Sequence, residues 1–252
     1  MPSQVESVAS ENDTNGHLPA ARKRERLPSA EKARYRCLMA KLDDIRESLQ
    51  AAEREQDLDA ADAHRNAFLE LAPDGAERDE VQFRHALSLL LRHSDVDGAL
   101  QAFKEVAGSK GGALSQEARV SYAICLAAKK KRQQAIFELR RVIGQGQQIT
   151  AQSVQALDFL GLFLREAQAD SGEIEKVSRL RIEHCRGMAE QAQTPSERGH
   201  YLLRLAAALS DQGSTTALAE ARATFQQVIR LGKDLPAELL TAAKEQLRTL
   251  PR

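Results

Sequence analysis

Histidine, cysteine and acidic side chains are the groups of this 252-residue chain that could bind a metal ion or act in catalysis. The six histidines and three cysteines include no HExxH or CxxC arrangement. His85 and His93 are eight residues apart, about two helical turns, which is too far for adjacent ligands on one helix. The side chains of His184 and Cys185 would point about 100° apart on a helix. We therefore expect no metal site and no cofactor.

Nucleophilic catalysis also lacks a sequence pattern to support it. The chain has no GxSxG elbow and no glycine-rich phosphate loop. Its glycine pair Gly111-Gly112 falls in an expected connection between helices, and no strand precedes it. Acidic pairs such as Asp43-Asp44 belong to segments of ordinary charged composition, where a solvated helix face explains them. We therefore predict no catalytic residues and no enzymatic activity.

One dense group of positive charge could contact an anion. It is a run of four cationic side chains, Lys129, Lys130, Lys131 and Arg132, followed by Arg140 and Arg141. Such a run could bind RNA or an acidic partner, or serve as a nuclear-import signal in a eukaryote. Nucleic-acid-binding proteins usually add aromatic side chains for stacking, and none is interleaved with the run of four. We therefore favour a solvated turn between two helices and regard nucleic acid as the less favoured partner.

Composition limits the class of protein. Lys plus Arg equals Asp plus Glu at 36 each, so no net charge steers the chain toward nucleic acid. No apolar run approaches the roughly 18 residues that span a bilayer, and the polar start, Met1 to Asn15, has no apolar signal core. Cys37, Cys125 and Cys185 are widely spaced among apolar neighbours, which predicts buried, reduced thiols. We expect a cytoplasmic protein.

The elements that would position any site form a recurring helical pattern. Three segments share it: Ala99, Phe103, Val106 and Gly108; Ala135, Leu139, Val142 and Gly144; and Ala221, Phe225, Val228 and Gly232. Offsets of four and seven place the first three residues on one helical stripe, and the glycine falls where the helix would end. The first two segments are 36 residues apart. A period in the mid-thirties predicts stacked helical hairpins, a solenoid that presents a surface.

The rest of the chain can be divided on the same basis. Residues 1–28 have almost no large apolar side chains, so we predict a disordered N-terminal tail. Residues 29–252 are predicted to form one helical-repeat domain. Apolar spacing and turn signals place its hairpins at about 31–72, 79–107, 115–144, 150–190 and 194–232, with a capping helix at 236–250.

These hairpins resemble the tetratricopeptide repeat, a helix-turn-helix unit of about 34 residues with bulky and small positions in a fixed order. The matching positions in the second hairpin are Phe83, Ala86, Leu87, Leu90, Ala99, Phe103 and Val106. In the fourth hairpin, Leu160-Gly161 reproduces the Leu-Gly pair of the family. Arg119 departs from the usual large apolar residue, the closing proline appears only at Pro73, and the first-helix tryptophan is absent.

The resemblance implies an all-α, right-handed superhelix of about five antiparallel hairpins with a C-terminal capping helix. It also implies that the first helix of each hairpin lines a concave groove, where a peptide or a helix of another protein binds. The groove positions that it implies are Arg84, Ser88, Arg92, Ser121, Ile124, Asp158, Leu162, Arg165, Tyr201 and Arg204. The chain lacks the Lys and Asn combination with which chaperone-binding members of the family hold a terminal carboxylate.

We interpret the chain as a non-catalytic adaptor or scaffold. The groove arginines would suit an acidic or carboxylate-bearing partner, although their stems could equally lie over apolar surface. Two other functions stay open: a regulatory module that senses a ligand or peptide, and a protein that contacts RNA or another anion through residues 129–141. The identity of the partner and the oligomeric state are not predicted.

Overall fold

The computed structural model describes residues 29–109, 112–145 and 149–251. Every regular element in these ranges is helical. The elements are α1 (Ser29–Glu55), α2 (Leu58–Leu71), α3 (Ala76–Leu91), α4 (Val96–Gly108), α5 (Ser115–Ala128), α6 (Arg132–Gln145), α7 (Ala151–Glu166), α8 (Ser171–Gln191), α9 (Pro195–Gln212), α10 (Thr215–Leu231), the short 3₁₀ helix η1 (Gly232–Asp234) and α11 (Ala237–Thr249). The predicted tail, residues 1–28, lies outside the described ranges.

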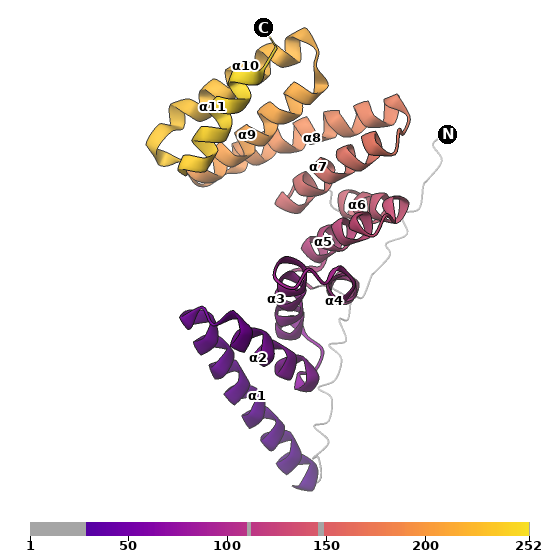
Figure 1. Ribbon diagram of the computed structural model, residues 1–252, viewed down its shortest axis with the longest axis vertical. Helices are drawn as coiled ribbons and strands as arrows, with labels where there is room; N and C mark the ends of the chain where they lie inside the picture. Colours follow the sequence, from indigo (N-terminus) through magenta and orange to yellow (C-terminus); the bar gives the residue numbers. More distant parts are fainter. Residues whose placement is uncertain (1–28, 110–111, 146–148, 252) are drawn as a thin grey trace, which may run out of the picture.

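Consecutive helices form five antiparallel hairpins, and α11 follows the last of them. The hairpins stack in chain order along an arc, so α1 and α11 lie at opposite ends of the molecule (Figure 1). Packing is between neighbours in sequence, with further contacts of α5 with α7 and of α9 with α11. The predicted solenoid of five hairpins with a C-terminal capping helix is therefore confirmed.

The three recurring stripes are the buried faces of the second helices. Phe103 and Leu139 are inaccessible to solvent and Phe225 is 1% exposed. Phe103 packs edge-on against Phe83 of α3, with the ring centroids 5.4 Å apart. Each stripe joins a hairpin to its neighbours, because its residues belong to clusters that draw on adjacent helices. The hydrophobic burial that drives folding is thus spread along the arc.

Local signals fix the helix ends. At the start of α9, Thr194 Oγ1 accepts a hydrogen bond of 3.1 Å from the backbone N–H of Glu197, and Pro195 occupies the first turn. The carboxylate of Glu197 accepts from the backbone N–H of Gln193 rather than completing the box at Thr194. Gly213, at φ 71°, ends the helix in the left-handed conformation.

The turns inside the other four hairpins use a residue other than glycine in this conformation. Gln56, Ser94, Lys130 and Gln168 have φ between 52° and 60°. Each lies between the two helices of one hairpin, where Gly213 lies in the fifth. Because side chains with a Cβ are strained at positive φ, each of the four turns stores a small destabilisation.

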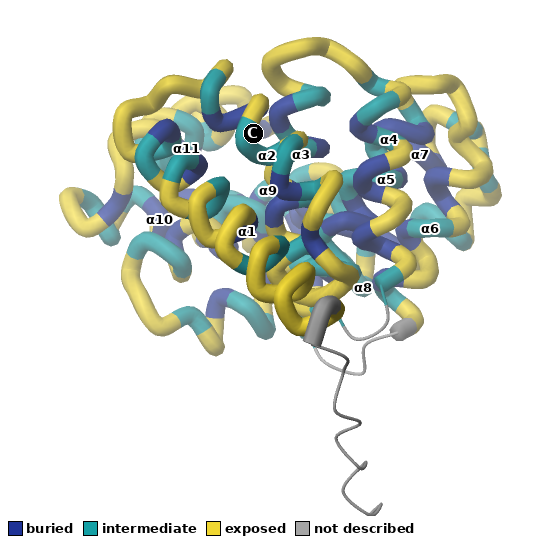
Figure 2. The backbone as a smooth tube through the Cα atoms, turned by 90° about the horizontal axis from the view of Figure 1, so that it is seen from below, coloured by how far each residue is buried: buried dark blue, intermediate teal, exposed yellow. Residues whose placement is uncertain are grey.

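The first hairpin differs from the others in length. Its α1 has 27 residues whereas α2 has 14, and the start of α1 is exposed (Figure 2). The expectation that all three thiols are buried is wrong for Cys37, which is exposed, whereas the adjacent Leu38 and Met39 pack against the cluster that contains Leu42 and Phe68. Cys125 and Cys185 are buried, and burial raises the pKa of their thiols to about 11 and about 12.

Candidate functional site

The open side of the arc carries the candidate partner surface. The first helices α3 and α5 lie on this side, and the second helices α4 and α6 lie on the other (Figure 1). Two large apolar side chains on first helices are accessible: Leu91 of α3 is 75% exposed and Leu162 of α7 is 40% exposed. Ile124 of α5, a first helix that lies between α3 and α7 along the chain, is half-buried. We call the exposed positions of α3, α5 and α7 the inner face.

A groove of about 520 Å³ lies between α3 and the start of α5. Its apolar lining includes Phe83, Leu87 and Leu114, and its charged lining includes Arg84 and Glu117. Leu87 and Leu91 are four residues apart, so they lie on the same side of α3. This part of the inner face therefore offers apolar surface beside charged groups.

The predicted groove arginines of α3 are held in ion pairs with the first hairpin. Arg84 donates to Glu53 of α1 at 3.2 Å and to Glu80 of its own helix at 2.7 Å. Arg92 donates to the carbonyl of Leu58 at 2.9 Å and to Asp59 at 2.7 Å. An acidic partner would have to compete with these carboxylates.

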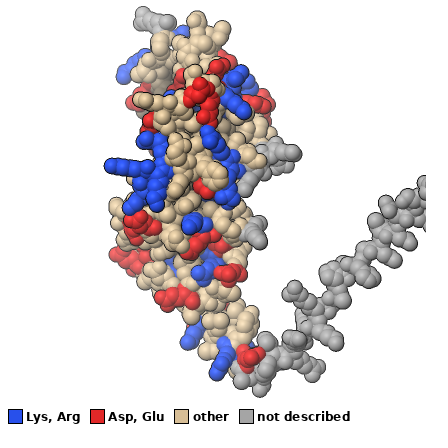
Figure 3. Space-filling view, turned by 90° about the vertical axis from the view of Figure 1, so that its right-hand side faces the viewer, with Lys and Arg blue, Asp and Glu red and all other residues tan. Residues whose placement is uncertain are grey.

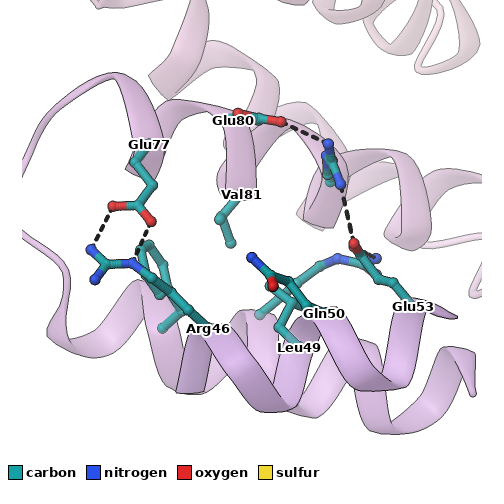
Figure 4. Close-up of a pocket in the computed structure, with 10 residues that line it drawn as sticks. Arg46, Leu49, Gln50, Glu53, Glu77, Glu80 and Val81 are labelled. Carbon is teal, nitrogen blue, oxygen red and sulfur yellow. Dashed lines mark hydrogen bonds and ion pairs between the residues drawn. The ribbon is translucent and has the colours of Figure 1, made fainter. Parts of the chain in front are cut away.

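A small pocket of about 190 Å³ opens between α1, α2 and α3, with an Arg–Glu ion pair on each of two sides. Arg46 of α1 donates to both oxygens of Glu77 at 2.5 and 2.7 Å, while the pair of Arg84 and Glu53 lies at the other side (Figure 4). Leu49 and Val81 lie between the two pairs. The sequence carries no local signal of this site, because each pair joins residues 31 positions apart.

A second network joins α7, α8 and α9. Asp158 accepts from Arg204 at 2.9 Å and from Arg181 of α8. Arg181 also donates to Asp211 at 2.6 Å, while Arg165 approaches Asp211 only to 3.9 Å. Burial disfavours the charged form of Arg181 and by itself would lower the pKa of the guanidinium. The carboxylates of Asp158 and Asp211 favour the charged form more strongly, so the pKa is raised above its ordinary value. The structure thus brings together three of the predicted residues, Asp158, Arg165 and Arg204.

The remaining predicted groove residues are less accessible. Ser88 is 7% exposed and its hydroxyl donates to Asp62 at 2.7 Å, and Tyr201 is 8% exposed within the C-terminal core. Ser121 and Ile124 are half-buried. Leu91 was not among the predicted positions, although it lies seven residues after Arg84 and therefore on the same helical face.

Two of the four predicted anion-contact residues, Lys129 and Arg132, also pair with neighbouring carboxylates. Lys129 donates to Asp97 at 2.8 Å and Arg132 lies 2.8 Å from Glu166. Lys130 and Lys131 form no ion pair within the described ranges. Arg140 pairs with Glu173 of α8, and Arg141 approaches Glu138 only to 3.4 Å.

No helix in the described ranges combines the length and apolar character that crossing a membrane requires. No cluster of three or more His, Cys, Asp or Glu side chains suited to a metal ion occurs in that part of the chain.

Comparison with solved structures places the fold. BtubC (BKLC) from P. vanneervenii superposes with a TM-score of 0.55 at 15% identity, over 89% of this chain and 91% of that one. PilW, described as a widely conserved type IV pilus biogenesis factor, gives 0.52 at 15% identity, over 84% and 92%. A Podosopora anserina putative kinesin light chain with nearly identical TPR-like repeats gives 0.51 at 14% identity, over 76% and 94%.

No family model and no curated protein matches the sequence. At these identities the structural matches establish the fold alone. The chain has the fold of the TPR-like helical-repeat proteins, in agreement with the resemblance found in its sequence.

Proposed function

On the basis of this TPR-like fold, we propose that the protein is a non-catalytic adaptor that binds a segment of another protein along its inner face. Two observations support the proposal: Leu91 and Leu162 are exposed on first helices, and a groove of about 520 Å³ with Phe83, Leu87 and Leu114 in its lining lies between α3 and α5. Helical-repeat proteins bind partners along extended concave surfaces, and apolar side chains on such a surface offer area that a bound segment can cover.

The charges of the inner face indicate how a partner would be oriented. Arg84 and Arg165 are about half exposed, with side-chain accessibilities of 50% and 44%. A segment with apolar side chains at intervals and an acidic group beside them would fit both features, because the arginines can exchange an intramolecular carboxylate for one of the partner. We include in the proposal a cytoplasmic location, for which the free thiols of Cys125 and Cys185 are suited.

The test compares inner-face variants with a matched control. Leu91→Asp and Leu162→Asp each place a charge on the inner face, and Leu71→Asp alters a leucine of α2 that is 37% exposed. Each protein is immobilised and challenged with nuclease-treated extract of the native source, followed by mass spectrometry and titration of the captured protein. We expect one captured protein whose affinity falls at least about fivefold with both inner-face variants and not with Leu71→Asp. Equal affinity of all four proteins would refute the proposal.

A further inference from the structure

A second surface lies on the other side of the arc, on α6, and the adaptor function does not use it. Phe137 of α6 is 59% exposed, and the chain has only seven phenylalanines. A single exposed ring needs no explanation by itself. Phe137 lies between the run Lys129–Arg132 and the pair Arg140 and Arg141, so an aromatic side chain is interleaved with the basic stretch 129–141.

The ring lies in a row of side chains that could hold a planar ligand. Gln133, Phe137 and Arg141 are four residues apart and lie on one side of α6. The guanidinium carbon of Arg141 lies 5.9 Å from the ring centroid of Phe137. Phe137, Gln133, Gln134 and Tyr122 line a pocket of about 290 Å³. One wall is therefore aromatic, and two amides at its edge can both donate and accept hydrogen bonds.

A second pocket of about 220 Å³ adjoins the first, since both are lined by Tyr122 and Glu138. Lys104, Arg119 and Arg141 also line it. Arg119 is only 8% exposed and donates to Glu138 and to the carbonyl of Ala107, each at 2.7 Å. Its buried Nε–H has no hydrogen-bond partner in the part of the chain that the structure describes. Arg119 thus contributes positive charge to the wall of this pocket, while its Nε–H is itself shielded from solvent.

The local charge is positive in a chain that is neutral overall. Residues 129–141 include six cationic side chains and one acidic one, Glu138. On the face of the molecule that Figure 3 shows, Lys and Arg side chains gather on both sides of uncharged surface at mid-height, and Asp and Glu side chains lie above and below them. Lys129, Arg132 and Arg140 pair with carboxylates of the protein, whereas Lys104, Lys130 and Lys131 form no ion pair within the described ranges. These three lysines therefore carry the positive charge that remains available to a ligand.

We propose that this outer surface, centred on Phe137 with Gln133, Gln134, Arg141, Lys130 and Lys131, binds single-stranded nucleic acid. A base stacks on Phe137 and meets the amides of Gln133 and Gln134, and the flanking phosphates contact the cationic groups. An acidic peptide would satisfy the charges but would leave the exposed ring and the amide-lined pocket without a partner. The surface is separate from the inner face, so this inference does not depend on the adaptor function.

The test measures fluorescence anisotropy of labelled oligonucleotides with the full-length protein. The probes are oligo(U) and oligo(dT) of about 12 nucleotides, a length suited to the site sizes of single-strand binders. Polyglutamate of matched length represents an acidic peptide. We expect oligonucleotide binding at low salt that weakens as salt rises, because binding releases counterions from the phosphates. Equal affinity for oligo(U) and oligo(dT) would indicate recognition of base and phosphate, and tighter binding of oligo(U) would add recognition of the 2′-hydroxyl.

Matched variants locate the contact. Tyr35→Ala is the control for Phe137→Ala, because both rings are 59% exposed and Tyr35 lies on α1. We expect Phe137→Ala to weaken binding at least about fivefold, within the usual range for loss of one stacked base, and Tyr35→Ala to leave it unchanged. Lys130→Gln with Lys131→Gln should weaken binding and reduce its salt dependence, whereas Lys32→Gln with Lys41→Gln on α1 should not.

Three results would overturn the inference. They are absence of oligonucleotide binding at about 50 mM salt, where phosphate contacts are strong, polyglutamate binding as tight as that of oligo(U), and equal loss of affinity with Phe137→Ala and Tyr35→Ala. Circular dichroism melting of each variant establishes that the helices are intact, so loss of binding cannot be confused with unfolding.

Discussion

Arg204 of α9 donates to Asp158 of α7 at 2.9 Å, and this contact joins the first helices of two successive hairpins. The same carboxylate accepts from Arg181 of α8, whose side chain is only 14% exposed. One aspartate therefore satisfies guanidinium groups from both helices that follow it. The relationship between hairpins four and five thus depends on a polar contact in addition to the apolar stripes.

Replacement of Asp158 by Asn should destabilise the C-terminal hairpins. The change leaves Arg181 with Asp211 alone, and removal of one partner of a largely buried pair is costly because the remaining charge is not compensated. We expect a loss of about 1–3 kcal/mol in the free energy of unfolding, since Asp158 is partly exposed. Urea titration followed by circular dichroism measures it.

The control for this variant is Glu245→Gln on α11, an exposed carboxylate that forms no ion pair within the described ranges. Its free energy of unfolding should change by less than about 0.5 kcal/mol. A similar effect of both variants would mean that Asp158 contributes only through net charge.

The stability of the second hairpin should fall as the pH drops below about 6.5, the ordinary histidine value. Burial lowers the pKa of His85 on α3, and its Nδ1 has no hydrogen-bond partner in the described part of the chain. As the pH falls, His85 therefore takes up its proton in the unfolded chain before it does so in the folded protein. The contribution of neutral His85 to the free energy of unfolding is complete above the pKa of the unfolded chain, and it is lost as the pH falls through the lower pKa of the folded protein.

His85→Gln should reduce this pH dependence. We expect its urea midpoint to change less between pH 7 and pH 5 than that of the wild type. Some dependence should persist, because burial also lowers the pKa values of His184 and His200. His64→Gln on α2 controls for removal of a histidine, and an unchanged profile with His85→Gln would contradict the assignment.

The two glycines inside α7 and α9 should respond in opposite ways to the same substitution. A Cβ at Gly161 would meet atoms only at 3.7 and 3.8 Å, which is ordinary contact, so Gly161→Ala should gain about 1 kcal/mol of helix propensity. A Cβ at Gly199 would lie 2.4 Å from the buried side chain of Leu235, so Gly199→Ala should be destabilising. Thermal melting of the two variants checks the sign of each effect.

The repeating fold could be predicted because its signal is local and periodic. Ala99, Phe103 and Val106 recur at helical spacing, and burial of a stripe on each hairpin is what stacking requires. The charged contacts could not be predicted with the same means. Glu53 and Arg84 are 31 residues apart, and their meeting depends on how one hairpin is rotated on the next.

The candidate surfaces were predicted only in part for a related reason. The family pattern selected Ser88, which packs toward the preceding hairpin, and passed over Leu91, which is accessible. Phe137 adjoins the buried Ile136 in the sequence, so apolar periodicity alone could not place it outside the core. Exposure at these positions is decided by the neighbouring hairpin, which a single helix pattern does not contain.

The left-handed turn residues give a last prediction, which concerns Gln168 between α7 and α8. Gln168 has φ 52° and is exposed, so its side chain adds strain to the turn without packing in the core. Glycine adopts this conformation freely, although it also gives the unfolded chain more freedom. We expect Gln168→Gly to stabilise the protein by up to about 1 kcal/mol, which would raise Tm by roughly 2–4 °C for a chain of this size. The reciprocal change, Gly213→Ala at φ 71°, should lower Tm in the corresponding turn of the fifth hairpin, because it introduces the strain that Gln168→Gly removes. If both variants lowered Tm, the conformation of Gln168 would not be the strained one that its φ angle indicates.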